Sequence, residues 1–135
     1  MSKGSRVLIA DDNRQFAQAV GARLASAGYE VFLAGDAYNA LVGTVRERPH
    51  VLLLDIHMPA GEGFSVPERL SKMTHVQPPA VIYLTGDRGE QTRQQADACG
   101  PHTLLYKPMA PEDVLDAVNA AMEQNKVCVD VEIER

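Results

Sequence analysis

Three short segments of this chain are almost entirely apolar: Arg6–Ala10, Val51–Leu54 and Ala80–Leu84. A strand with one face in water alternates apolar and polar residues, whereas a strand buried on both faces reads as a continuous apolar run. Two further segments with strand character, Glu30–Leu33 and Thr103–Tyr106, complete a set of five. The pattern therefore predicts a parallel sheet that is covered by helices on both sides.

The segments between these strands carry helix signals. In the first of them, apolar residues recur every three or four positions, at Phe16, Val20, Leu24 and Ala27. Asp12 or Asn13 can cap the start of this helix, and Gly28 marks its end. Further helices are predicted after Asp36, over Val66–Lys72, over Gly89–Cys99 and from Pro111 onward.

Five strands that alternate with five helices in 135 residues indicate one α/β domain. We expect this domain to occupy residues 1–125. The last ten residues, 126–135, alternate apolar and polar side chains, which is typical of a strand. We interpret them as a tail, a pairing strand or the stump of a linker.

The charge balance limits the classes of partner. With 13 basic and 18 acidic residues, the formal charge of −5 argues against a protein that binds nucleic acid through a broad basic face. No apolar run reaches the 18 or so residues of a membrane helix, and the start lacks a secretory signal, so we expect a cytoplasmic protein without membrane contact. Cys99 and Cys128 form no metal-binding or disulfide motif, and we expect both thiols to be reduced.

Polar residues stand where the predicted strands end. Asp11 and Asp12 follow the first strand, Asp55 the third, Thr85 the fourth and Lys107 the fifth. In an open parallel sheet, ligands bind beyond the carboxyl ends of the strands. Crowded carboxylates share a hard divalent cation, and Mg²⁺ suits a site with few protein ligands that also holds phosphate. Lys107 and Thr85 supply a positive charge and a hydroxyl donor for phosphoryl oxygens.

At these positions the sequence resembles the receiver domain of two-component response regulators. The resemblance covers nearly the whole chain up to the last helix. It rests on the acidic pair, the acceptor segment, the hydroxyl residue and a Lys-Pro pair, matched here by Asp11, Asp12, Asp55–Pro59 with Gly63, Thr85 and Lys107–Pro108. Each motif alone is common, but their order and spacing together are specific.

The resemblance implies a flavodoxin-like, doubly wound fold with a central five-stranded parallel sheet in the order 2-1-3-4-5. It implies that Asp55 accepts a phosphoryl group from a sensor histidine kinase or a histidine phosphotransfer protein. Mg²⁺ would be held by Asp12, Asp55 and the backbone carbonyl of His57, with Asp11 as a further metal residue that acts mainly through bound water. Lys107 and Thr85 would bind the phosphoryl group. The domain would catalyse its own Mg²⁺-dependent phosphorylation and slow dephosphorylation, without the turnover of a conventional enzyme.

The resemblance also implies that phosphorylation switches a surface made by the helix over 89–99, the strand over 103–106 and the helix from residue 111. This surface would serve a downstream output domain or partner, or a homodimer. One departure is Leu104, since the family places Tyr or Phe three residues before the lysine. Tyr106 lies on the same strand face, and we hypothesise that it substitutes. The alternative is a receiver-like interaction module that works without phosphorylation.

Other polar residues leave two interpretations open. His57 and Asp87 lie two residues beyond Asp55 and Thr85, where the family tunes the lifetime of the phosphoryl group, but both are equally well explained as exposed polar side chains. His50, His75 and His102 receive no role. The helix over 89–99 has few apolar anchors, namely Ala96, Ala98 and Cys99. We expect it to be weakly held, which suits a switching element.

Overall fold

The computed structural model describes residues 4–58, 61–62, 64–99 and 102–134. Its main sheet contains five parallel strands, which lie in the order β2 (Glu30–Ala34), β1 (Arg6–Ala10), β3 (Val51–Asp55), β6 (Ala80–Thr85) and β7 (Thr103–Tyr106). A separate antiparallel pair, β4 (His57–Met58) and β5 (Gly61–Glu62), follows β3. With that small pair set aside, the main sheet has the predicted order 2-1-3-4-5.

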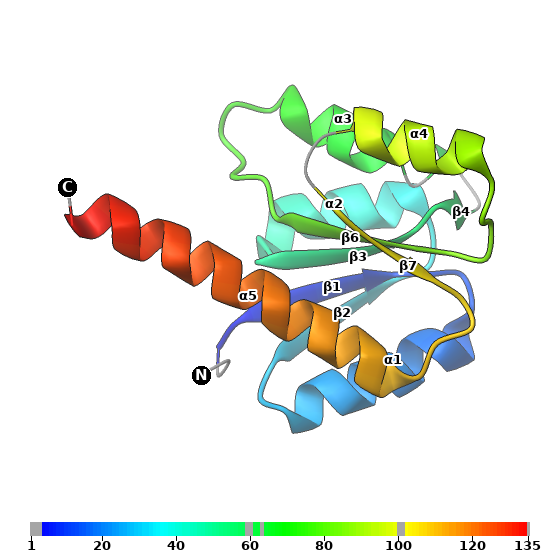
Figure 1. Cartoon of the computed structure of the whole chain (residues 1–135), viewed down its shortest axis with the longest axis horizontal. Coiled ribbons are helices and arrows are strands. Elements are labelled where there is room, and N and C mark those ends of the chain that lie inside the picture. The colour runs from blue at the N-terminus through cyan, green and yellow to red at the C-terminus, as the bar shows by residue number, and fades with distance from the viewer. Residues whose placement is uncertain (1–3, 59–60, 63, 100–101, 135) are drawn as a thin grey trace.

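Helices cover both faces of the sheet (Figure 1). One face carries α1 (Arg14–Ser26) and α5 (Pro111–Glu134), and the other carries α2 (Ala37–Glu47), α3 (Ser65–Ser71) and α4 (Glu90–Ala98). The strands point the same way, so their carboxyl ends and the loops that follow lie along one edge, on the right in Figure 1. The doubly wound α/β fold predicted from the sequence is confirmed.

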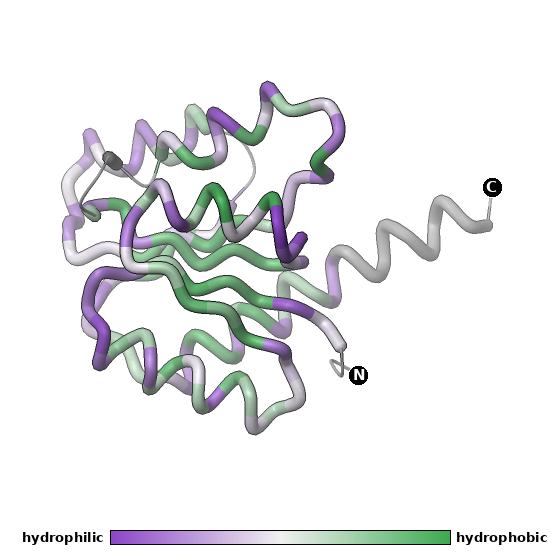
Figure 2. The backbone as a smooth tube through the Cα atoms, turned by 180° about the vertical axis from the view of Figure 1, so that it is seen from behind, coloured by the Kyte–Doolittle hydropathy of each residue, from purple (hydrophilic) through white to green (hydrophobic). Residues whose placement is uncertain are grey.

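The core consists of two apolar layers, one on each side of the sheet (Figure 2). Successive side chains of β1 alternate between them, with Val7 and Ile9 packing toward α1 and α5 and Leu8 packing toward α2 and α3. All five residues of β3 are buried. This double burial explains why the central strands are continuous apolar runs in the sequence.

Side-chain caps set two helix starts. Asn13 accepts a hydrogen bond from the Phe16 amide at the start of α1, and Asp36 accepts one from the Asn39 amide at 2.7 Å at the start of α2. Both caps agree with the sequence prediction, in which Asn13 was one of two candidates. The α2 helix ends at Glu47, and Arg48 follows in the left-handed conformation with φ of 51°.

Of the three interpretations of residues 126–135, the pairing strand is wrong, while a tail or a linker stump stays a prediction. The backbone of α5 stays helical from Pro111 to Glu134, so the segment 126–134 continues the last helix, which extends past the sheet in Figure 1. A strand needs a partner for its backbone hydrogen bonds, whereas a helix that has already formed adds one internal bond per residue. The boundary of the domain at residue 125 remains a prediction.

The α4 helix has few buried side chains, as expected. Of the predicted anchors, only Ala96 is buried, while Ala98 and Cys99 are exposed. The second buried residue of α4 is Thr92, a polar side chain that the apolar pattern did not reveal.

In the described part of the chain, no helix is long and apolar enough to cross a membrane.

Candidate functional site

The sheet brings the predicted site residues to one edge. Asp55 is the last residue of β3, and it pairs in register with Leu84, which immediately precedes Thr85. Asp11 follows Ala10, whose register partner on β3 is Leu54. Lys107 follows Tyr106, whose register partner on β6 is Thr85. Each polar side chain stands where its strand leaves the sheet, because the strands run parallel and end together.

Three carboxylates and one ammonium group meet at this edge. Asp11, Asp12 and Asp55 each offer an oxygen within 4.8 Å of the others. Asp11 and Asp55 are 3% and 7% exposed, whereas Asp12 is open to solvent. The Lys107 Nζ atom lies 2.8 Å from Asp11 Oδ2 and 3.8 Å from Asp55 Oδ2. The residues predicted as metal ligands and as the cationic partner are therefore neighbours in space.

Backbone groups fix the orientation of the two buried carboxylates. The amide of Asn13 donates to Asp11 Oδ1 at 2.8 Å, and the amide of His57 donates to Asp55 Oδ1 at 3.2 Å. In both cases the donor lies two residues after the carboxylate, a local turn that Asp residues readily adopt. These contacts leave the second oxygen of each carboxylate facing the shared space near Lys107.

Lys107 is held at both its backbone and its side chain. Its amide donates to the Thr85 carbonyl at 2.7 Å, which ties the end of β7 to the end of β6. Its Nζ atom lies 4.9 Å from the centroid of the Phe16 ring, a cation–π contact. The periodicity of the sequence predicts only a packing role for Phe16 on α1, and no motif marks its position over the lysine.

Burial and like charge make Asp55 an unusual carboxyl group. Loss of hydration, and next the charge of Asp11, raise the pKa of Asp55 from 3.8 to about 6. Lys107 and the His57 amide act in the opposite direction and offset part of this effect. The site therefore favours anything that adds positive charge beside Asp55, whether a proton or a metal ion.

The donor set fits a hard divalent cation. The buried Asp11 Oδ2 atom has no well-aligned hydrogen bond, although the Lys107 ammonium group lies beside it. An oriented carboxylate oxygen of this kind, close to two more carboxylates, offers the all-oxygen ligands that Mg²⁺ prefers. Asp12, being exposed, leaves room for the water molecules that Mg²⁺ usually retains.

Thr85 and Asp87 form a hydrogen-bonded unit beside the carboxylates. Thr85 is fully buried, and its Oγ1 atom accepts a hydrogen bond from the Asp87 amide at 2.9 Å. Asp87 Oδ2 accepts the hydroxyl of Thr92 at 2.7 Å, and Oδ1 accepts the Gly89 amide at 2.8 Å. These hydrogen bonds, that from Thr92 first, lower the pKa of Asp87. Sequence reasoning placed Asp87 near the site but missed its bonds to α4.

His57 and Asp87, the pair with two open interpretations, lie close to each other. The His57 Nε2 atom is 3.8 Å from Asp87 Oδ2, and both side chains are about half exposed, at 54% and 46%. This ion-pair geometry is available when His57 is protonated. Neither residue is a solitary surface group, and their effect on phosphoryl lifetime stays a prediction.

The environment of Leu104 and Tyr106 bears on the missing aromatic residue. Leu104 packs against the apolar layer beneath α2, α3 and α4. Tyr106 is half-buried, and the guanidinium of Arg88 lies 4.6 Å from the centroid of its ring. Tyr106 therefore contacts the loop that joins Thr85 to α4. The hypothesis that it substitutes for the missing ring stays a prediction.

Some sequence predictions fall elsewhere. Pro59 and Gly63, two residues of the acceptor motif, lie outside the described residues. His50 and His102, which received no role, serve local structure. His50 Nδ1 accepts the Arg6 amide at 3.0 Å, and the His102 ring packs edge-on against Tyr83.

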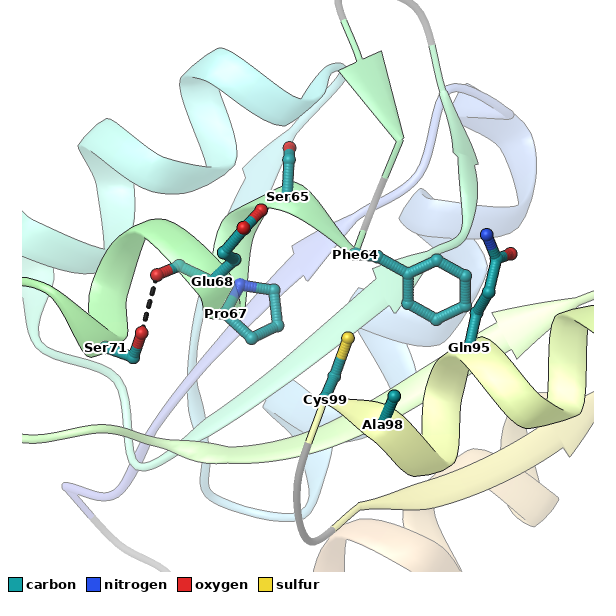
Figure 3. Close-up of a pocket in the computed structure, with 8 residues that line it drawn as sticks. All are labelled: Phe64, Ser65, Pro67, Glu68, Ser71, Gln95, Ala98 and Cys99. Atoms are coloured by element: carbon teal, nitrogen blue, oxygen red, sulfur yellow. Dashed lines mark hydrogen bonds between the residues drawn. The ribbon is translucent and has the colours of Figure 1, made fainter.

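A separate hollow of about 540 Å³ lies between α3 and α4 (Figure 3). Phe64 and Pro67 line it from the α3 segment, and Gln95, Ala98 and Cys99 line it from the α4 segment. Among the described residues that line it, Glu68 is the one charged side chain, and the others are polar or apolar. These described residues offer neither a group of metal ligands nor a cation for a phosphoryl group, so the chemistry described above belongs to the acidic edge.

Comparisons with known proteins agree with this geometry. The sequence matches the family described as response regulator receiver domain over residues 7–119. It is 32% identical over 121 residues to the response regulator MprA of Mycobacterium leprae, which covers 90% of this chain and 52% of that protein. It is 30% identical over 119 residues to the DNA-binding dual master transcriptional regulator RpaA of Synechocystis, which covers 88% of this chain and 49% of that protein. The chain thus spans about half the length of these curated relatives.

Solved structures show the same fold. The chemotaxis protein CheY4 of Vibrio cholerae superposes with a TM-score of 0.79 at 29% identity, covering 87% of this chain and 98% of that one. A CheY-like receiver domain protein from Methanospirillum hungatei gives 0.80 at 28% identity, covering 90% and 97%. With the family match across most of its length, the chain belongs to the receiver domains of two-component response regulators.

Proposed function

We propose that Asp55 is the phosphoacceptor of this receiver domain. The observation that carries the proposal is the meeting of Asp55 with two more carboxylates and the Lys107 ammonium group at the carboxyl edge of the sheet. A carboxylate oxygen of Asp55 attacks the phosphorus of a phosphohistidine. The bond between phosphorus and the imidazole nitrogen breaks, the nitrogen keeps the electron pair, and an acyl phosphate forms on Asp55.

The neighbouring side chains support this transfer by charge and orientation. Lys107 lies within 3.8 Å of Asp55 and can pair with a phosphoryl oxygen once that group replaces the free carboxylate. Thr85, one residue beyond the register partner of Asp55, can donate its hydroxyl hydrogen to another phosphoryl oxygen. The His57 amide keeps Asp55 Oδ1 in place, which leaves Oδ2 directed toward the open side.

We propose Mg²⁺ as the cofactor, with Asp11, Asp12, Asp55 and the backbone carbonyl of His57 as its protein ligands. When bound, it would neutralise the negative charge that gathers on the phosphoryl oxygens. The cluster of three carboxylates and the poorly satisfied Asp11 Oδ2 atom support this assignment. In the absence of a cation, the repulsion from Asp11 works against ionised Asp55.

The partners follow from the family. Receiver domains interact with histidine kinases or histidine phosphotransfer proteins, and the curated relatives are longer regulators. We propose that this chain receives its phosphoryl group from such a donor. We further propose that it signals through the surface of α4, β7 and α5, to an output domain, a partner or a second copy. Cytoplasmic location stays a prediction from the sequence.

Incubation with Mg²⁺ and acetyl phosphate, followed by intact-mass measurement, tests the assignment. The wild-type chain is expected to gain one labile phosphoryl group, and Asp55→Asn is expected to gain none, because an amide cannot form the acyl phosphate. A chelator in place of Mg²⁺ should abolish the adduct on the wild type. A folded wild-type chain that binds Mg²⁺ but stays unmodified would contradict the proposal and favour an interaction module that works without phosphorylation.

A further inference from the structure

The loop between β6 and α4 contains a chain of hydrogen bonds that begins at Thr85. The Asp87 amide donates to Thr85 Oγ1 at 2.9 Å, so the position of the Thr85 hydroxyl and the position of the Asp87 backbone are linked. The Asp87 carboxylate is then engaged twice on the side of the helix, by the Gly89 amide and by the Thr92 hydroxyl. One residue therefore connects the fully buried Thr85 to the first turn of α4.

These bonds matter because α4 has little else to hold its start. Gly89, the residue at the N-cap position, has no side chain to cap the helix, and the carboxylate of Asp87 binds the Gly89 amide instead. Thr92 is 6% exposed, and the hydroxyl of this buried side chain is satisfied by Asp87 at 2.7 Å. With only Thr92 and Ala96 buried on α4, loss of the Asp87 contacts would leave the first turn weakly attached.

We propose that Asp87 is a positioning residue that transmits movement of Thr85 to α4, an inference that rests on the proposed phosphorylation of Asp55. If the Thr85 hydroxyl moves toward a phosphoryl group on Asp55, it either carries the Asp87 amide with it or breaks the 2.9 Å hydrogen bond. In the first case the carboxylate that holds Gly89 and Thr92 is displaced, and in the second the Asp87 backbone loses the hydrogen bond that fixes it relative to Thr85. This route to α4 needs no aromatic side chain at position 104.

The sequence offers a matched pair of glycine substitutions for a test. A methyl group added at Gly89 would lie 3.0 Å from Asp87 Oδ1, so Gly89→Ala shifts the carboxylate by a few tenths of an ångström without removing it. A methyl group at Gly86, in the same loop, meets nothing within 4 Å, so Gly86→Ala is the control. Two further variants remove the bonds directly: Asp87→Ala removes the carboxylate, and Thr92→Val keeps the buried volume of the threonine while removing its hydroxyl.

Hydrogen exchange of the amides in residues 89–93 measures the attachment of the first turn of α4. Each variant of the full chain is measured with Mg²⁺ alone and with Mg²⁺ and acetyl phosphate, and the intact mass of the same sample gives the phosphorylated fraction. In the wild type and in Gly86→Ala, phosphorylation is expected to accelerate exchange at least about threefold. In Asp87→Ala and Thr92→Val, exchange should already be about three to ten times faster without the donor, as expected from losing one or two hydrogen bonds, and Gly89→Ala should show a smaller increase.

The response to phosphorylation separates transmission from simple capping. If Asp87 transmits the movement, Asp87→Ala and Thr92→Val still form the adduct, but their exchange changes less than about 1.5-fold when it forms, with Gly89→Ala between them and the wild type. If Asp87 only caps the helix, exchange accelerates in both states and the wild-type response to phosphorylation persists, which overturns the proposal. If the wild type forms no adduct, the proposed function fails and transmission fails with it. If Asp87→Ala forms the phosphoryl adduct and its hydrogen exchange in residues 89–93 responds as in the wild type, the role of Asp87 in transmission is wrong while the proposed function stands.

Discussion

Asp55 combines burial with proximity to another acid. Its side chain is nearly covered, and the charge of Asp11 adds to the loss of hydration in raising its pKa to about 6. Lys107 reduces this penalty without removing it. An arrangement of this kind destabilises the folded chain by itself, and it is typical of a site whose carboxylates are held together for chemistry rather than for stability.

Asp55→Asn is expected to stabilise the metal-free chain in a way that depends on pH. The folded pKa of Asp55 is about 6 and its ordinary value is 3.8, so the folded state binds the proton more tightly than the unfolded state. The cost of ionisation is absent below about pH 4, grows between pH 4 and 6, and is complete above pH 6. We expect Asp55→Asn to raise the free energy of unfolding by about 1–3 kcal/mol at pH 7.5 and by much less at pH 4.

Urea unfolding at both pH values, with a chelator present, measures this effect. Asp12→Asn serves as the control, because Asp12 is exposed and its substitution should have a smaller effect at pH 7.5. If Asp55→Asn changes stability equally at both pH values, or lowers it at pH 7.5, the electrostatic account of the site is wrong.

Single residues show where sequence reasoning reached its limit. Asp11, Asp12, Asp55, Thr85 and Lys107 could be predicted, because each stands at the carboxyl end of a strand or just beyond it, and parallel strands end at one edge. The contact of Phe16 with Lys107 and the bonds of Asp87 to Gly89 and Thr92 could not. They depend on side-chain directions in loops and helices, which leave no periodic signal in the sequence.

At the scale of the element, the helices differ in how their starts are held. The α2 helix is capped by its own N-cap residue, since Asp36 accepts both the amide and the side-chain nitrogen of Asn39. The α4 helix depends on Asp87, which lies in the preceding loop. The cap of α2 stabilises that helix independently of changes at the acidic edge. The start of α4 is capped by a residue of the loop after Thr85, so its stability depends on the position of that loop.

Asp36→Ala is expected to lower the free energy of unfolding by about 1 kcal/mol, because the amide at the start of α2 loses its acceptor. Asp36→Ser, which retains a capping oxygen, should recover most of this loss. Chemical unfolding measures both variants, and phosphorylation by acetyl phosphate should be unaffected in each. A stability of Asp36→Ala equal to that of the wild type would mean that the cap contributes nothing.

The sequence predicted most of the elements for reasons that the structure makes plain. β1, β3 and β6 are continuous apolar runs because both faces of the sheet are covered, and Asn13 and Asp36 mark helix starts because their side chains accept amide hydrogens. The segment 126–134 misled the prediction because a period of two signals a strand only where a partner strand exists. There the preceding turns of α5 decide the backbone conformation.

For the whole molecule, the packing of α5 supports the predicted extent of the domain. Among the α5 side chains that the structure describes, Val114, Leu115 and Val118 are buried in the core, and Ala117, Ala121 and Met122 are partly buried against it. All of these precede residue 125, the predicted end of the domain. A receiver unit that ends there would contain both apolar layers and the complete acidic edge.

Removal of residues 126–135 is therefore expected to leave the midpoint of thermal unfolding within about 2 °C of the full chain. Phosphorylation by acetyl phosphate should proceed at the same rate. A second truncation that ends at Asn119 removes Ala121 and Met122 as well and should unfold at a clearly lower temperature. A large loss of stability on removing residues 126–135 alone would show that the domain extends further along α5.

The most direct test of the whole account is to locate the modified residue. After incubation with Mg²⁺ and acetyl phosphate, borohydride reduces an aspartyl phosphate to homoserine with release of phosphate, and peptide mass spectrometry identifies the position. We expect homoserine at residue 55 alone, and only when both Mg²⁺ and the donor are present. Homoserine at residue 11 or 12, or an adduct that forms equally well without Mg²⁺, would contradict it.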